Sequence, residues 1–188
     1  NLSLPAPVIF GCIDTKLTDE EKTFFSLNRP LGLILFTHNC NNPSQVRALI
    51  NEFREIVEID NAPILIDQEG GRVTRLLPPH WRHPPPAKFF PLIFKQNVAD
   101  AKLAAYLNTC LIGKELKDLN ITVNCLPVLD LPVEGAHEVI GDRSLGNNVD
   151  TIVSLGKALS EGLLNEGILP VMKHIPGHGR AKSDSHLE

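Results

Sequence analysis

Short runs of apolar residues alternate along the chain with longer amphipathic stretches. The apolar runs predict five β-strands, at residues 8–14, 31–37, 62–67, 121–126 and 168–172. Apolar positions at helical spacing predict helices at 46–58, 98–118 and 149–165, and a further helix entered at Thr18. This alternation is typical of repeated βα units, and therefore of an α/β protein with a parallel sheet.

The length of the repeat is compatible with two α/β folds. Units of about 35 residues fit a (βα)8 TIM-type barrel, which normally takes about 250 residues, so this chain would supply about the first five units. An open, doubly wound sheet of five strands is the alternative, and it would be complete in 188 residues. We expect a single barrel domain over residues 1–188, incomplete at its C-terminal end.

Two stretches interrupt the alternation, at residues 78–91 and 132–148. The first holds six prolines around Trp81, which excludes an interior helix or a central strand, so we interpret it as a long loop. Long ordered loops are often functional, but this one could equally be a surface excursion. Trp81 would then either stack on a ligand or cover the sheet.

The composition is that of an ordinary globular protein, with 43% hydrophobic and 21% charged residues and a net charge of −4. Basic residues form no stripe, so nucleic acid is not an expected partner. No apolar run approaches the roughly 20 residues that span a bilayer, so no membrane is expected either. The four cysteines stand far apart without a CxxC pair, which favours buried thiols in a reducing compartment. We expect a cytoplasmic protein that is a monomer at full length.

Polar side chains cluster at the carboxyl ends of the predicted strands. In a parallel sheet these ends share one edge, where α/β proteins bind ligands. Each residue singly could be a helix cap or a solvated loop group, but together they suit a ligand rich in hydroxyl groups. No glycine pattern of a nucleotide-binding loop follows any strand. The residues are Asp14, His38, Asp67, Glu69, Asp130, Lys173 and His174.

The segment after the last strand is the densest in chemistry. The apolar run at 167–172 predicts a buried strand, and His174, His178, Asp184 and His186 follow it. These four could ligate a metal in a metal-dependent hydrolase. However, the intervening proline and glycines oppose a helical pair of ligands and there is no HExxH motif, so we expect neither metal nor cofactor.

Four blocks of the sequence, in order, carry a resemblance to a known family. They are residues 64–73 with Arg75, residues 124–130, residues 141–144, and residues 173–179 with 184–186. Together they resemble glycoside hydrolase family 3, in its bacterial β-N-acetylglucosaminidase branch. The resemblance implies a TIM-type barrel that removes terminal non-reducing β-linked N-acetylglucosamine with retention of configuration. In bacterial members the implied substrates are muropeptide fragments from peptidoglycan recycling.

The resemblance also implies roles for particular residues. His186 would be the general acid/base and Asp184 its partner, which suits an imidazole that titrates near neutral pH beside a carboxylate. The glycines at 177 and 179 predict that this loop is mobile and swings in when sugar binds. The sugar would be held by Asp67, Arg75, Arg143, Lys173 and His174.

Two alternatives concern these assignments. The charged residues could simply pair among themselves at the mouth of the barrel, and Glu69 could point inward to a backbone partner.

The family's aspartate nucleophile belongs to a later segment than any in these 188 residues. We therefore expect little or no turnover by this chain alone, and a non-catalytic N-acetylglucosamine-binding module is the alternative function.

Overall fold

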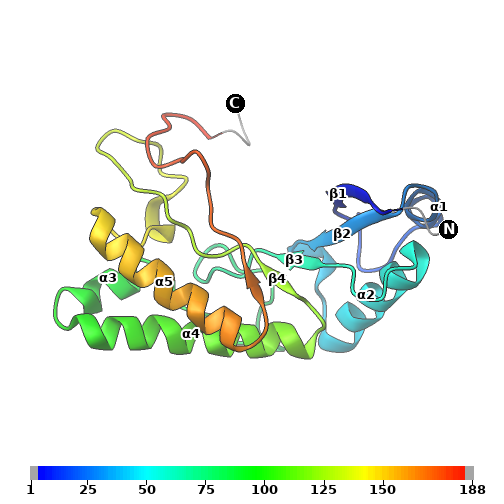
Figure 1. Ribbon diagram of the computed structural model, residues 1–188, viewed down its shortest axis with the longest axis horizontal. Helices are drawn as coiled ribbons and strands as arrows, with labels where there is room; N and C mark the ends of the chain where they lie inside the picture. The colour runs from blue at the N-terminus through cyan, green and yellow to red at the C-terminus, as the bar shows by residue number, and fades with distance from the viewer. Residues whose placement is uncertain (1–3, 185–188) are drawn as a thin grey trace.

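The computed structural model describes residues 4–184 and contains a five-stranded parallel sheet (Figure 1). Its strands are β1 (Ala6–Phe10), β2 (Pro30–Leu35), β3 (Ile64–Ile66), β4 (Val123–Asn124) and β5 (Leu169–Pro170). Neighbours in the sheet follow one another in the sequence, in the order β1-β2-β3-β4-β5. A doubly wound sheet requires a reversal of strand order, so this alternative is wrong and the fold is a partial barrel.

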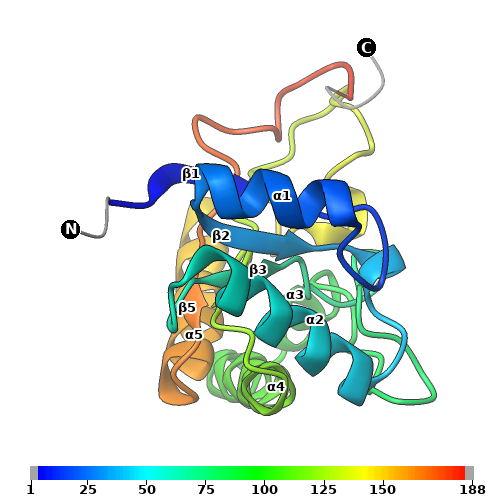
Figure 2. The same cartoon turned by 90° about the vertical axis from the view of Figure 1, so that its right-hand side faces the viewer.

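A long helix connects each pair of successive strands. The four connections are α1 (Asp19–Asn28), α2 (Pro43–Val57), α4 (Val98–Asp118) and α5 (Val149–Asn165). Right-handed crossovers between strands in sequential order place every helix on the same face of the sheet. Figure 2 shows α1 and α2 side by side against β2 and β3. The 3-10 turns η1 (Thr37–Asn39) and η2 (Gly141–Arg143) follow β2 and β4 toward the carboxyl edge of the sheet, while the short helix α3 (Phe89–Phe94) packs against α4 and α5.

The helices begin where side chains satisfy their first backbone N–H groups. At α1, the Thr18 hydroxyl accepts from the Glu21 N–H at 3.1 Å, and the Glu21 carboxylate accepts from the Thr18 N–H at 2.8 Å. Asparagines cap the three other connecting helices. The predicted entry at Thr18 is therefore confirmed, and α2 begins at Pro43, directly after its Asn42 cap, where the Asn-Pro pair ahead of Val46 is a helix-start signal in the sequence.

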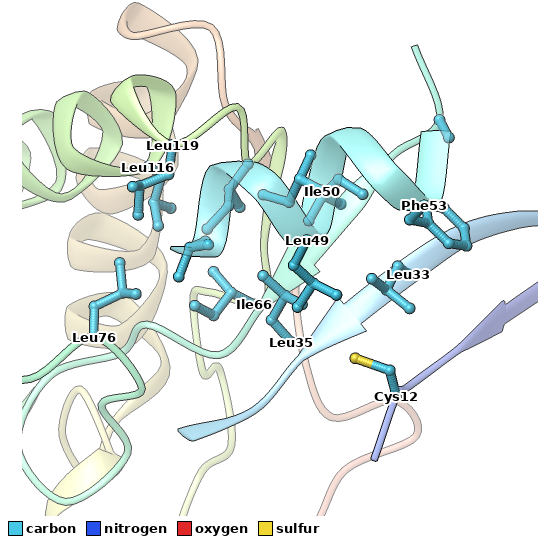
Figure 3. Packing of buried hydrophobic residues seen from close by; sticks show 14 of the residues in the cluster. Cys12, Leu33, Leu35, Leu49, Ile50, Phe53, Ile66, Leu76, Leu116 and Leu119 are labelled. Atoms are coloured by element: carbon cyan, nitrogen blue, oxygen red, sulfur yellow. The ribbon is translucent and has the colours of Figure 1, made fainter. Parts of the chain in front are cut away.

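The main core lies between the sheet and α2 (Figure 3). Alternate residues of β2 and β3 face the helix, and one side of α2 closes over them. Each fully buried aliphatic or aromatic side chain contributes about 1.5–3 kcal/mol, so this layer holds the strands in register. The completely inaccessible residues of β2, α2 and β3 are Leu33, Leu35, Val46, Ile50, Phe53, Val57, Ile64 and Ile66.

The fifth strand differs from its prediction. The run at 167–172 predicts burial, yet Leu169 is 60% and Met172 57% exposed. The reason is that β5 is the last strand of the sheet, and within residues 4–184 nothing pairs with its outer edge. All five strands also cover different bounds from those predicted.

The proline-rich loop at 78–91 is ordered against the turn after β3. The Gly71 N–H donates to the Pro84 carbonyl at 2.9 Å, and a Cβ at Gly70 would lie 2.3 Å from the Pro85 carbonyl oxygen. Gly70 and Gly71 both have positive φ, and a Cβ at either position would collide with the proline-rich loop. Glycine is therefore needed for its backbone conformation and for its lack of a side chain. Trp81 packs against the main core, which makes it a cover for the fold.

The end of this loop corrects a second expectation. Residues 89–94 form α3, although the proline content of the stretch predicts no helix. Pro91 lies in the first turn of α3, where its missing N–H has no intrahelical partner to lose. Within residues 4–184 no helix is long and apolar enough to cross a membrane.

Candidate active site

The structure brings charged side chains from three loops together at the carboxyl edge of the sheet. Asp67 and Glu69 follow β3, Arg143 lies in η2, and Lys173 and His174 follow β5. The parallel strands β3, β4 and β5 are adjacent, so residues more than 100 positions apart in the chain become neighbours. The predicted convergence of these residues is therefore present, whereas their roles toward a sugar stay predictions.

Lys173 is held between two carboxylates. Its Nζ lies 2.7 Å from Asp67 Oδ1 and 2.6 Å from Glu69 Oε1. The Glu69 side chain is only 3% exposed, so it meets its cations away from water. The ammonium group has three N–H donors, and these two bonds leave one for a ligand.

Arg143 forms a two-pronged ion pair with the same glutamate. Its Nε donates to Glu69 Oε2 at 2.9 Å and its Nη2 donates to Glu69 Oε1 at 2.8 Å. This fork geometry fixes the plane of the guanidinium group. The Nη2 atom also lies 3.4 Å from His174 Nε2, so the glutamate, the arginine and the imidazole form one network.

Arg75 approaches the cluster from the turn after β3. Its Nη2 lies 3.5 Å from Asp67 Oδ2, and its guanidinium carbon is 5.6 Å from the centre of the Phe36 ring. The buried Gln68 shapes this turn, because its Oε1 accepts from the backbone N–H groups of both Arg75 and Leu76. Two hydrogen bonds between the Asn124 amide and the Gln68 backbone tie the turn to β4.

The second acid of the site is Asp130, which follows β4. Its side chain is completely buried and accepts hydrogen bonds from His174 Nδ1, from the His174 N–H at 3.2 Å and from the His178 N–H. The His174 imidazole is one-third exposed and therefore reaches the surface of the site. Asp130 thus connects β4 to the loop after β5.

Oppositely charged neighbours shift the pKa values of Asp67 and Arg143 in the direction that favours their charged forms. Burial by itself would raise the pKa of Asp67, but Lys173 and then Arg75 outweigh it and hold the pKa below its ordinary value. For Arg143, burial acts to lower the pKa, and the bond to Glu69 more than offsets it, so the pKa is raised. Asp67 and Arg143 are therefore each held in the charged form.

A cavity of about 430 Å³ borders this network. Asp130, Lys173 and His174 line it together with Arg180 from the following loop. Apolar side chains, including Leu129, Leu131 and Met172, form the rest of the wall, so the cavity combines a few charged groups with an apolar surface. Asp67, Glu69, Arg75 and Arg143 are not among its lining residues. Among the described residues, no group of three or more His, Cys, Asp or Glu side chains is arranged to hold a metal ion.

Other predicted residues lie elsewhere. The His38 Nε2 atom lies 3.1 Å from the Cys12 carbonyl and the Asp14 carboxylate accepts from the Thr15 N–H, so these two side chains stay with the ends of β1 and β2. Asp184 is half-buried at the end of the described chain. His186 lies outside the described residues.

Sequence reasoning placed Glu69 and Asp130 among the polar residues at the strand ends but gave neither one a partner in the site. Glu69 does not turn to a backbone partner but joins Lys173 and Arg143, and Asp130 binds His174. The pairing of Asp67, Arg75 and Lys173 among themselves, which was an alternative to sugar binding, is also present. Their positions in the sequence indicate that both acids belong to the site, because each follows a strand that ends at the shared edge of the sheet.

Comparison with known proteins places this geometry in a family. Residues 9–188 match the N-terminal domain of glycosyl hydrolase family 3. The chain belongs to this family. Family 3 relatives named beta-hexosaminidase include those of Alkalilimnicola ehrlichii, 35% identical over 98% of this chain, and Methylococcus capsulatus, 32% identical over 95%. The chain spans about half the length of these relatives, 52% in both cases.

Solved family 3 structures show the same architecture. NagZ from Neisseria gonorrhoeae in complex with N-trifluoroacetyl-D-glucosamine has a TM-score of 0.89 at 33% identity and covers 98% of this chain. A family 3 β-N-acetylglucosaminidase from Paenibacillus has a TM-score of 0.82 at 32% identity and covers 95%. The matches cover 54% and 33% of those two chains respectively.

Proposed function

We propose that the protein is a retaining β-N-acetylhexosaminidase that removes terminal non-reducing β-linked N-acetylglucosamine from muropeptides in peptidoglycan recycling. The observation that carries the proposal is the network of Asp67, Glu69, Arg143, Lys173 and His174 at the carboxyl edge of a family 3 barrel. A similar fold is known in complex with N-trifluoroacetyl-D-glucosamine.

The sugar would be held by groups whose charges and directions are set before it arrives. Asp67 accepts from sugar hydroxyl groups, while Arg143 and Lys173 donate. Their mutual ion pairs limit side-chain motion, so little conformational entropy is lost on binding. Pairing among these charges therefore supports sugar binding instead of competing with it.

The chemistry would begin at the loop after β5. His186 protonates the leaving glycosidic oxygen and later takes a proton from water, and Asp184 orients it and favours its protonated form. Retention also requires a carboxylate that attacks the anomeric carbon, and the family resemblance assigns this role to a segment beyond residue 188. All four cysteines are unpaired, which supports a cytoplasmic location.

Sugar binding by this chain tests the proposal directly. We expect calorimetry to detect binding of N-acetylglucosamine, and Lys173→Ala to weaken it by about tenfold or more through loss of a charge-assisted hydrogen bond. Lys102→Ala, on the exposed side of α4, is the matched control and should leave affinity unchanged. Equal affinity in both variants, or no binding by the unmodified chain, would contradict the proposal.

Hydrolysis separates the two candidate functions. A chromogenic N-acetylglucosamine substrate should be cleaved by a chain that includes the downstream nucleophile segment, and His186→Ala should abolish cleavage. We expect the 188-residue chain to bind without turnover. Binding without turnover by the longer chain as well would favour the non-catalytic module.

A further inference from the structure

Asp130 has no exposed side-chain surface, so it acts through its neighbours. Oδ2 accepts from the His174 ring and from the His174 backbone N–H, and Oδ1 accepts from the His178 backbone N–H. An ionised carboxylate only accepts hydrogen bonds, so every one of these contacts requires a donor. Burial would raise the pKa of Asp130, but the bonds from His174 and His178 lower it below the ordinary value, so the group is ionised.

This arrangement determines which nitrogen of His174 carries the proton. Nδ1 faces the carboxylate and must be protonated, so in the neutral ring Nε2 is an acceptor. Nε2 faces Arg143 Nη2 at 3.4 Å, which is a donor. The opposite tautomer would set two N–H groups against each other there.

The same carboxylate also anchors the chain that continues toward Asp184. The bond to the His178 N–H fixes the first turn after His174. Further along, the Val133 N–H donates to the Gly179 carbonyl at 3.1 Å and the His137 N–H donates to the Ala181 carbonyl at 2.8 Å. These backbone bonds do not involve Asp130, so its replacement leaves the segment attached.

We propose that Asp130 is a positioning residue that holds His174 in the Nδ1-protonated tautomer, so that Nε2 is the acceptor facing Arg143 Nη2 and the ring keeps its place beside the sugar site. The tautomer follows from the described geometry alone. Its consequence for sugar affinity rests on the proposed function.

The variant Asp130→Asn tests the inference because it keeps the size of the side chain but has one acceptor and one donor. The amide can offer the His174 ring its oxygen, a neutral and weaker acceptor that preserves Nδ1–H, or its NH2 group, which requires the proton on Nε2. Nitrogen-15 spectra of histidine-labelled, sugar-free protein distinguish the two tautomers and report a change of acceptor at Nδ1. We expect Nδ1–H for His174 in the unmodified chain and altered His174 ring-nitrogen shifts in Asp130→Asn with either orientation.

His178→Ala is the matched control. It keeps the backbone N–H that Asp130 accepts, and His178 Nδ1 has no hydrogen-bond partner within residues 4–184. The His174 tautomer should therefore be unchanged, with only the small shift that loss of the neighbouring ring at 6.1 Å produces. An Nε2–H tautomer in the unmodified chain would overturn the inference without any variant, as would unchanged His174 ring-nitrogen shifts in folded Asp130→Asn.

Affinity for N-acetylglucosamine supplies the second readout. Asp130→Asn should weaken binding about tenfold in the unmodified background and by much less in a His174→Ala background, because it acts through that ring. Equal losses in both backgrounds would show that Asp130 does not act through His174. If the unmodified chain binds no sugar, the proposed function fails, while the sugar-free spectra still decide the tautomer.

Discussion

At the scale of single residues, the site depends on acids that have no access to solvent. Glu69 accepts three hydrogen bonds or ion pairs from Lys173 and Arg143, and its side chain is 3% exposed. A buried charge without a partner is much more costly than one with a partner. Removal of the Glu69 carboxylate would therefore leave two cations in a site built for their neutralisation.

Glu69→Gln should destabilise the fold by about 3 kcal/mol, because it breaks a buried ion-pair network from one side. Urea denaturation measures the free energy of unfolding. Glu161→Gln is the control, since the ion pair of Glu161 with Lys157 at 3.8 Å is exposed, and it should cost less than about 0.5 kcal/mol. Equal effects of the two substitutions would contradict the importance of the network.

Stability should fall in acid through Asp67. Its pKa is depressed in the folded state relative to an ordinary value of 3.8, so its contribution is fully present above pH 3.8. It is lost as the pH falls from 3.8 through the lower folded value. Free energies of unfolding measured between pH 2 and pH 6 should therefore decline in acid, and less steeply in Asp67→Asn. Identical slopes for the two proteins would refute this account.

At the scale of elements, the strands next to the site are short, so loops position most of its residues. Arg72 of the turn after β3 donates to the Asp142 carboxylate at 2.7 Å and to the Val139 carbonyl at 2.6 Å. It therefore links that turn to the loop that carries Arg143. The chain at 173–181 runs along residues 127–137 through backbone hydrogen bonds, so the three loops support one another.

Gly179 is where two of these loops approach most closely. A Cβ there would lie 2.2 Å from the Leu131 carbonyl oxygen and 2.5 Å from its carbon, and backbone atoms cannot move aside as a flexible side chain can. Gly179→Ala should cost about 1–3 kcal/mol in the free energy of unfolding. Gly11→Ala is the control because its nearest neighbour would be 3.5 Å away, and it should be nearly neutral. The prediction fails if the two variants are equally stable.

At the scale of the whole molecule, the sequential strand order produces an arc with two open edges among residues 4–184. Apolar side chains are exposed on the outer strands, with Ile9 of β1 40% and Leu169 of β5 60% accessible. Unpaired strand edges with apolar side chains favour association between chains. The 188-residue polypeptide should therefore self-associate as its concentration rises.

Sedimentation velocity tests this expectation. Leu169→Lys should reduce self-association because it places a charge on the β5 edge. Leu103→Lys, which replaces a similarly exposed leucine on α4, should have little effect. A chain that stays monomeric at high concentration, or equal effects of the two substitutions, would show that the edges do not mediate association.

The sequence by itself determined the number and type of the connecting helices and strands, the α/β class and the family resemblance. These follow from local signals, such as the capping box at Thr18 and the apolar spacing of α2, which act over a few residues. It did not determine the exposure of β5, because burial depends on which strands lie beside it.

Only the tertiary structure decided which charges meet. The contact between Asp67 and Lys173 spans 106 positions, and that between Asp130 and His174 spans 44. No local pattern specifies such partners, because they are set by the order and register of adjacent parallel strands. For the same physical reason, the roles of Glu69 and Asp130 emerged only once β3, β4 and β5 stood side by side.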